Sequence, residues 1–143
     1  MSRQVPRTVR ARVRARFGNR CAYCLAPQRL VLGFLEIEHV VPRAKGGPDG
    51  ETNLCLSCQM CNTYKAAQTH APDPETGRRP RLFNPRRQRW PTHFGWSVDG
   101  THAVGKTATG RATVAALQMN NAVAVAVRRE WVAAGLHPPD DIT

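Results

Sequence analysis

Apolar residues recur at a helical spacing near the start of the chain and crowd together without that spacing further on. Val9, Val13 and Phe17 are four residues apart between a proline and a glycine, which predicts an amphipathic helix over residues 6–17. Residues 30–41 are mostly apolar and β-branched, so we expect a strand or hairpin there. The chain therefore opens with a helix and continues into strand structure.

Turn-forming residues divide the next stretch. Pro42 ends regular strand pairing, and glycine and proline dominate residues 45–50, which predicts a loop. Residues 54–56 are a second candidate strand, and a helix is expected from Ser57 to about Gln68. Residues 70–81 are polar and rich in proline, which is typical of a linker or of an excursion over the surface.

The last third of the chain carries the signals of a hairpin followed by two helices. An Asp-Gly pair predicts the turn of a hairpin over residues 98–105. The candidate N-caps of the two helices are Thr107 or Thr109 and Asn120 or Asn121. On the second of these helices Val123, Val127 and Trp131 are spaced by four, and we expect this stripe to face the core. Helices mixed with short strands indicate the α+β fold class.

The charge of the chain is strongly positive. Lys and Arg total 21 against 10 Asp and Glu, a formal net charge of +11, which suits a polyanionic partner such as nucleic acid. A basic surface that only keeps the protein soluble is the alternative. The arginines of the first predicted helix fit either use, since they can meet phosphates or simply keep the helix solvated.

Length and composition limit the class of protein. With 143 residues, 41% of them hydrophobic and 22% charged, the chain suits one globular domain rather than a disordered or membrane protein. No apolar run approaches the roughly 20 residues of a membrane span, and no signal-peptide core follows the arginine-rich start. We therefore expect a soluble, cytoplasmic protein with no membrane partner, and the oligomeric state stays open.

Cysteine spacing indicates a metal site. Five cysteines, an odd number without an export signal, argue against a disulfide framework. Cys21 and Cys24 form one CxxC pair, and Cys55, Cys58 and Cys61 form two overlapping pairs. A redox CxxC would be expected beside a βαβ pattern, which this sequence lacks. We therefore predict that two CxxC pairs bind one tetrahedral zinc ion. The second pair is either Cys55 with Cys58 or Cys58 with Cys61, and a third alternative is that all three thiols surround the ion.

Residues 36–65 gather the groups that phosphodiester cleavage requires. A bound divalent ion neutralises charge in the transition state and stabilises the leaving oxygen. Hard cations such as Mg²⁺ prefer oxygen ligands, for which Glu38 and the side-chain carbonyl of Asn62 are best placed. His39 is the candidate general base, because histidine has an ordinary pKa of about 6.5 and is largely neutral at pH 7.

Strand geometry sets a condition on this site. Side chains alternate along a strand, so Glu36 and Glu38 face one side of it and His39 faces the other. A single pocket therefore needs the break at Pro42, or a bulge, to redirect one of these side chains. Without such a pocket, Glu38 and His39 would be a surface acid beside a hydrogen-bonded histidine.

Taken together, these residues resemble the HNH endonuclease family. The matching segments are Cys21-x-x-Cys24, Glu36-Ile-Glu38-His39-Val-Val-Pro42, Lys45-Gly46-Gly47, Asn53-Leu54 and Cys58-x-x-Cys61-Asn62-x-x-Lys65. Their order and spacing make the resemblance specific. It implies a ββα-metal core, in which a hairpin and a helix hold one catalytic divalent ion (Mg²⁺, Mn²⁺ or another), stapled by a structural zinc site. The rest of the chain looks like the C-terminal extension of many bacterial HNH proteins.

The resemblance also implies a role for each site residue. Glu38 and Asn62 would bind the catalytic ion, His39 would act as general base, and Asn53 would orient His39 or support the loop. The zinc ligands that it selects are Cys21, Cys24, Cys58 and Cys61. Separately, their charge and position lead us to expect that Arg43, Lys45 and Lys65 contact substrate phosphates.

These features predict a metal-dependent endonuclease that nicks or cuts DNA, most naturally double-stranded DNA. Residues 1–69 would form its catalytic core, and residues 70–143 an extension packed on that core within a single domain. The alternative is a zinc-ribbon protein that binds nucleic acid without cleaving it. Such a binder would keep the four cysteines and the positive charge but would not need Glu38, His39 and Asn62 together, so their joint presence favours the enzyme.

Overall fold

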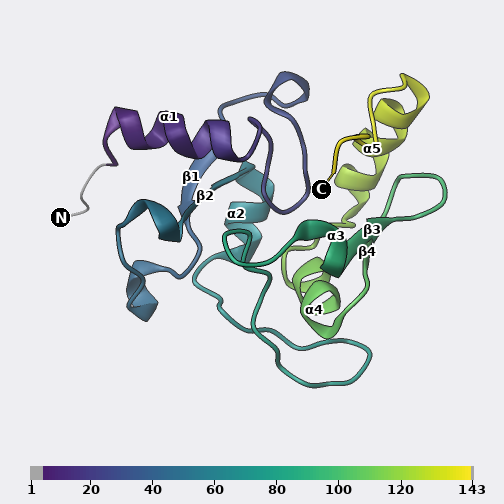
Figure 1. The fold of residues 1–143 in the computed structure, drawn as a ribbon. Helices are drawn as coiled ribbons and strands as arrows, with labels where there is room; N and C mark the ends of the chain where they lie inside the picture. The colour runs from purple at the N-terminus through teal and green to yellow at the C-terminus, as the bar shows by residue number, and fades with distance from the viewer. Residues whose placement is uncertain (1–4, 143) are drawn as a thin grey trace. The chain divides into compact units, whose positions relative to one another are not determined.

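The computed structural model describes residues 5–142 and shows an α+β fold, as the sequence predicts (Figure 1). The chain divides into two compact units, which are described separately. The first comprises the described residues up to Ala67 together with Asn84–Arg86, and the second comprises Gln68–Phe83 together with the described residues from Arg87 onward. Among residues 5–142, no helix has the length and apolar character needed to cross a membrane.

The first unit contains two helices and a two-stranded antiparallel sheet. In chain order its main elements are α1 (Arg7–Arg16), β1 (Glu36–His39), β2 (Leu54–Ser57) and α2 (Gln59–Lys65). Short 3-10 turns lie at Gln28–Leu30, Arg43–Lys45 and Glu51–Asn53. Glu38 pairs with Cys55 across the sheet, and His39 pairs with Leu54. Helix α1 packs against β2, and α2 packs against β1 (Figure 1).

The helix predicted over residues 6–17 is confirmed as α1. Its residue Val13 is fully buried, as are Leu54 and Leu56 of β2. Transfer of such side chains from water contributes roughly 1.5 to 3 kcal/mol each. This apolar contact packs the helix on the sheet, and Arg14 adds a hydrogen bond to the carbonyl of Leu35 at 2.9 Å.

The strand predicted over residues 30–41 is much shorter than expected. Only its last part, β1, pairs with β2. The side-chain amide of Gln28 donates to the carbonyl of Gly33 at 2.8 Å and accepts from the backbone amide of Leu35 at 2.8 Å. These two hydrogen bonds satisfy backbone groups that a neighbouring strand would otherwise pair. An apolar sequence therefore forms a loop, in which Leu32 and Phe34 are exposed.

Helix α2 is also shorter than predicted. It begins after Cys58, whose thiol accepts the backbone amide of Cys61 and so serves as the N-cap. It ends at Lys65 rather than near Gln68, because Ala66 has a φ of 49°, which is outside the helical region.

The second unit contains a hairpin and three helices. Its elements are α3 (Trp90–His93), β3 (Phe94–Trp96), β4 (Ala103–Gly105), α4 (Ala108–Ala116) and α5 (Ala122–Ala133). The predicted turn is confirmed, with Gly100 at a φ of 77°, although the first strand ends before residue 98. Two of the candidate caps are confirmed, since the side chains of Thr107 and Asn121 accept backbone amides of α4 and α5.

The apolar stripe of α5 does not face the core. Val123 is 73% exposed and Val127 is 39% exposed, so that expectation is wrong. The helix is anchored instead by Arg128, which is 3% exposed and donates to the carbonyls of Thr101 and Met119. Charge-assisted hydrogen bonds to buried carbonyls satisfy both partners, and no periodicity in the sequence reveals them.

Residues 70–81, which resemble a linker by composition, are held within the second unit. Asp73 is fully buried, and Arg111 donates two hydrogen bonds to its carboxylate, at 2.9 and 3.0 Å. The hydrogen bond from Arg111 is the main cause that holds the pKa of Asp73 well below its usual range. The segment is therefore a structural part of the unit.

Candidate functional site

Four cysteines lie close together in the first unit. The Sγ atoms of Cys21, Cys24, Cys58 and Cys61 all lie within 4.8 Å of one another, and all four residues are buried. The Sγ atoms of Cys24 and Cys58 are 3.7 Å apart. Tetrahedral Zn–S bonds of about 2.3 Å place sulfur atoms roughly 3.8 Å apart. The cluster therefore has the spacing and the ligand type of a structural zinc site.

Ionisation within this cluster is mutually dependent. Burial opposes charge on Cys21, but hydrogen bonds from Cys24, Cys58 and Cys61 lower the pKa of its thiol well below the usual range. Interaction with Cys21 is in turn the largest cause that raises the pKa of the Cys24 and Cys61 thiols. One thiolate, that of Cys21, is thus stabilised while ionisation of Cys24 and Cys61 is opposed. A bound dication would allow all four thiols to ionise.

The fifth cysteine, Cys55, lies outside the cluster. Its thiol donates to Oε2 of Glu38 at 3.3 Å and contacts the hydroxyl of Tyr23 at 3.7 Å. Burial, followed by the charge of Glu38, raises the pKa of Cys55 well above the ordinary value. It is therefore a neutral thiol beside a carboxylate, and the choice between the overlapping CxxC pairs falls on Cys58 and Cys61.

Glu38 is a buried carboxylate on β1. It is 6% exposed, and Nζ of Lys65 lies 2.9 Å from its Oε1. The Lys65 ammonium also donates a hydrogen bond to the carbonyl of Val40 at 2.9 Å, and among the described residues no further donor of regular geometry reaches Oε1. Burial raises the pKa of Glu38, and the positive charge of Lys65 offsets part of that rise. Oε1 is thus a buried anionic oxygen held in an ion pair with Lys65.

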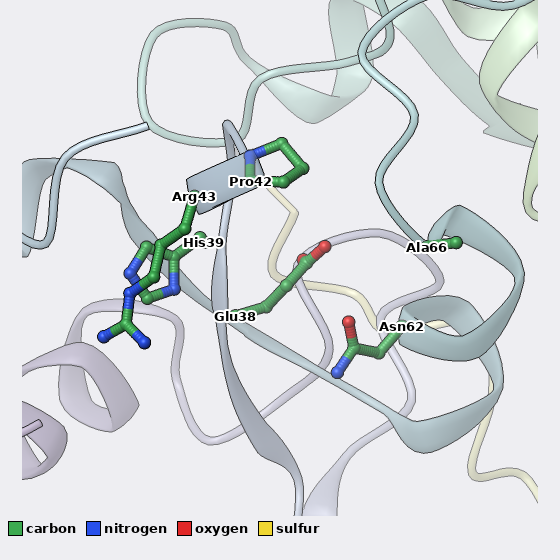
Figure 2. A pocket seen from close by; sticks show the side chains of 6 residues that line it. All are labelled: Glu38, His39, Pro42, Arg43, Asn62 and Ala66. Carbon is green, nitrogen blue, oxygen red and sulfur yellow. The ribbon is translucent and has the colours of Figure 1, made fainter. Parts of the chain in front are cut away.

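Asn62, on the second turn of α2, faces the same side of the sheet as Glu38. Its Nδ2 donates to Oε1 of Glu36 at 3.0 Å. Because the amide nitrogen is engaged there, the amide oxygen is turned away from Glu36. Figure 2 shows that this oxygen is directed toward the carboxylate of Glu38. Glu36 therefore has a visible part in the site, since it orients the Asn62 amide.

His39 lies on the other side of β1, as strand alternation requires. Its Nε2 is 2.9 Å from Oδ1 of Asp49, and Nε of Arg43 is 2.6 Å from the same oxygen. The hydrogen bond from Arg43 and then that from His39 lower the pKa of Asp49. Asp49 was not singled out from the sequence, where it is one acid in a glycine-rich loop.

A cavity of about 260 Å³ reaches both sides of β1 at its C-terminal end. It is lined by Glu38, His39, Pro42, Arg43, Asn62 and Ala66. In Figure 2, Glu38 and Asn62 point into one side of this space, while His39 and Arg43 lie together across the strand. Strand pairing ends with β1 at His39. The cavity therefore reaches both Glu38 and His39, although they point to opposite sides of β1 and the strand pairing has no bulge.

Asn53 supports the loop that follows β1. Its Oδ1 accepts the amide of Val41 at 3.0 Å, and its Nδ2 donates to the carbonyls of Val41 and Pro48 at 3.0 and 2.8 Å. Gly47 packs on the same backbone, since a Cβ there would lie 1.7 Å from the carbonyl oxygen of Val41. Of the two roles that the resemblance suggests for Asn53, these contacts correspond to loop support.

The three predicted phosphate contacts differ in their surroundings. Lys45 is exposed, and Arg43 is exposed while bound to Asp49. Lys65 is 1% exposed, with its ammonium held between Glu38 and Val40. A buried ammonium in this position does not reach a phosphate, so Lys65 does not match the expected phosphate contact. The Lys65 side chain points inward from α2, which the motif spacing does not predict.

Comparison with known families assigns the part of the chain that carries this site. Residues 21–68 match the family model of the HNH endonuclease. These residues form an HNH domain. The match includes both CxxC pairs, the β1–β2 hairpin and α2, and it places the domain in a nuclease family whose substrates are nucleic acids. No curated protein and no solved structure matches the chain.

The residues of the HNH domain fit the two metal ions that such a domain implies. The four thiols match a zinc site in ligand type, number and spacing. For a hard divalent ion the candidate ligands are oxygens, the buried Oε1 of Glu38 and Oδ1 of Asn62. When bound there, the ion would polarise a phosphate oxygen and stabilise a leaving oxygen.

Proposed function

We propose that the protein is a metal-dependent endonuclease that hydrolyses phosphodiester bonds of double-stranded DNA. The observation that carries the proposal is that one cavity of the HNH domain is lined by Glu38, His39 and Asn62. A zinc-ribbon binder would need the thiols and the positive charge but not an oxygen-ligand pair beside a histidine.

Each side chain has a distinct task in the proposed reaction. His39 takes a proton from a water molecule as that water attacks the phosphorus. Glu38 and Asn62 would hold a divalent ion, and Arg43 and Lys45 bring positive charge to the phosphate backbone. Attack in line with the scissile bond would leave 5′-phosphate and 3′-hydroxyl ends, as the HNH resemblance implies. Phosphate contacts of this kind hold DNA without reading its sequence.

A plasmid assay tests the proposal. Supercoiled plasmid is incubated with zinc-loaded protein in Mg²⁺ or Mn²⁺, beside His39→Ala and the control His70→Ala, whose histidine is exposed and outside the HNH cavity. We expect His39→Ala to lower the nicking rate by about 10²- to 10⁴-fold, the usual contribution of a general base. His70→Ala should retain the wild-type rate.

Two outcomes would contradict the nuclease assignment. In the first, His39→Ala nicks as fast as the wild type, and the activity then comes from a contaminant or from another site. In the second, wild type and His39→Ala bind DNA equally and neither nicks in any divalent ion, which fits a zinc-ribbon binder. Ligation of the product ends, with and without phosphatase treatment, checks the expected end chemistry.

A further inference from the structure

The carboxylate of Asp49 joins the candidate general base to the loop that follows β1. Its Oδ1 is 2.9 Å from Nε2 of His39 and 2.6 Å from Nε of Arg43. The arginine nitrogen is always a donor, so this oxygen is an acceptor. Two converging nitrogens on one carboxylate oxygen are satisfied when both of them donate. The geometry therefore places the proton of a neutral His39 ring on Nε2.

The tautomer of His39 decides which nitrogen can accept a proton. A neutral imidazole has one N–H donor and one acceptor nitrogen, and the bond made by the first fixes the role of the second. With Nε2–H directed at Asp49, the lone pair is on Nδ1. Among residues 5–142, no hydrogen-bond partner of Nδ1 is present. That nitrogen is the one left for a water molecule.

The position of Asp49 is itself fixed by the loop. Asn53 donates to the carbonyl of Pro48, the residue directly before Asp49, at 2.8 Å. The 3-10 turn at Arg43–Lys45 carries the arginine that donates to the same carboxylate oxygen as His39. Asp49 is thus held through its backbone neighbour and through its side chain, although the carboxylate is 45% exposed.

We propose that Asp49 is a positioning residue, which accepts the Nε2 proton of His39 and thereby presents Nδ1 as the proton acceptor of the hydrolytic reaction. The inference rests on the proposed role of His39 as general base. It assigns a task to an acid that the HNH resemblance did not name. In a competing arrangement Asp49 pairs with Arg43 and His39 only until a phosphate displaces it, and removing Asp49 would then tighten DNA binding.

Nitrogen-15 NMR on the zinc-loaded full chain tests the tautomer directly. Two-bond ¹H–¹⁵N correlations at a pH where the ring is neutral, assigned by their loss in His39→Ala, report which nitrogen carries the proton. We expect the Nε2–H form in the wild type and a mixture of tautomers in Asp49→Ala. Asp49→Asn keeps an oxygen that both donors can share, so it should retain most of the Nε2–H preference.

Steady-state nicking supplies the second measurement. Asp49→Ala should lower kcat by about 10-fold or more with DNA affinity little changed, as is usual when a carboxylate partner of a functional histidine is removed. Asp49→Asn should recover part of that loss. The matched control is Glu51→Gln, which removes an acid from the same loop that is paired with Arg12 at 2.8 Å and not with His39.

Three results would overturn the assignment. They are an Nδ1–H tautomer in the wild type, the same tautomer in wild type and Asp49→Ala, or Asp49→Ala that turns over as fast as the wild type and binds DNA more tightly. The last result identifies Asp49 as a displaceable blocking charge. If the wild type nicks nothing, the nuclease proposal fails, while the NMR measurement still decides the orientation of His39.

Discussion

At the scale of single residues, the buried pair of Lys65 and Glu38 is the most consequential contact of the site. Removing the ammonium by Lys65→Met leaves a 6% exposed carboxylate without its cation. Breaking a buried ion pair from one side typically costs about 3 kcal/mol or more. We expect a loss of that size in the free energy of unfolding, measured by urea denaturation of zinc-loaded protein without other divalent ions.

A divalent ion should compensate for this substitution if Glu38 holds it. An ion that binds only the folded state raises stability, and the gain grows with the ratio of the ion concentration to its Kd. Mn²⁺ or Mg²⁺ should therefore raise the melting temperature of Lys65→Met more than that of the wild type. The matched control is Lys45→Met, which removes an exposed lysine and should change stability by no more than about 0.5 kcal/mol. Equal responses of Lys65→Met and the wild type would count against Glu38 as a ligand.

The residue types of the candidate site could be predicted from the sequence, but their partners could not. Motif spacing indicated Glu38, His39 and Asn62, and the structure lines one cavity with them. Lys65 and Asp49 take their roles from where a helix and a loop turn their side chains, at 2.9 Å from Glu38 and His39 respectively. Such contacts depend on tertiary packing, which local spacing does not encode.

At the scale of elements, the short helix α2 begins at the cluster of four cysteines. Isolated helices below about 12 residues are marginal in water, and α2 has 7. Its first turn is built on the thiol of Cys58, which accepts the amide of Cys61. We expect Cys61→Ser to lose bound zinc and, with it, the helical signal of α2. Elemental analysis and circular dichroism of the purified protein measure both.

The fifth cysteine provides the matched control for the zinc ligands. Cys55→Ser alters a buried thiol that contacts Glu38 and Tyr23 and lies outside the cluster. It should retain one zinc per chain and the helical signal, whereas Cys61→Ser should not. Loss of zinc from both variants, or from neither, would contradict the assignment of ligands.

Helices whose N-terminal capping residues are recognisable could be predicted better than elements recognised only by a run of apolar residues. Thr107 and Asn121 cap helices as expected, because a short polar side chain satisfies the first free amides. The apolar run at residues 30–41 does not form a strand over most of its length, because the side-chain amide of Gln28 pairs with its backbone. In α5 a buried arginine, Arg128, replaced the valine stripe as the anchor.

At the scale of the whole molecule, the positive charge is unevenly divided. The first unit, Met1–Ala67 with Asn84–Arg86, has 12 Lys and Arg against 4 Asp and Glu, a formal charge of +8. The second unit has 9 against 6, a formal charge of +3. The unit that contains most of the HNH domain therefore carries most of the field that attracts a polyanion.

This division predicts which arginines control the salt dependence of DNA binding. Each phosphate contact contributes a slope of about −0.9 to the plot of log affinity against log salt concentration. Replacing exposed Arg7 and Arg16 of α1 together by glutamine should lower affinity at low salt and reduce the slope by up to about 2. The matched pair in the second unit, Arg78→Gln with Arg79→Gln, makes the same change in net charge and should have the smaller effect.

Fluorescence anisotropy with duplex DNA across a salt series measures both slopes. If the second pair reduces the slope as much as the first, phosphate binding does not follow the charge of the unit that holds α1, and the arginines of α1 serve to solvate that helix.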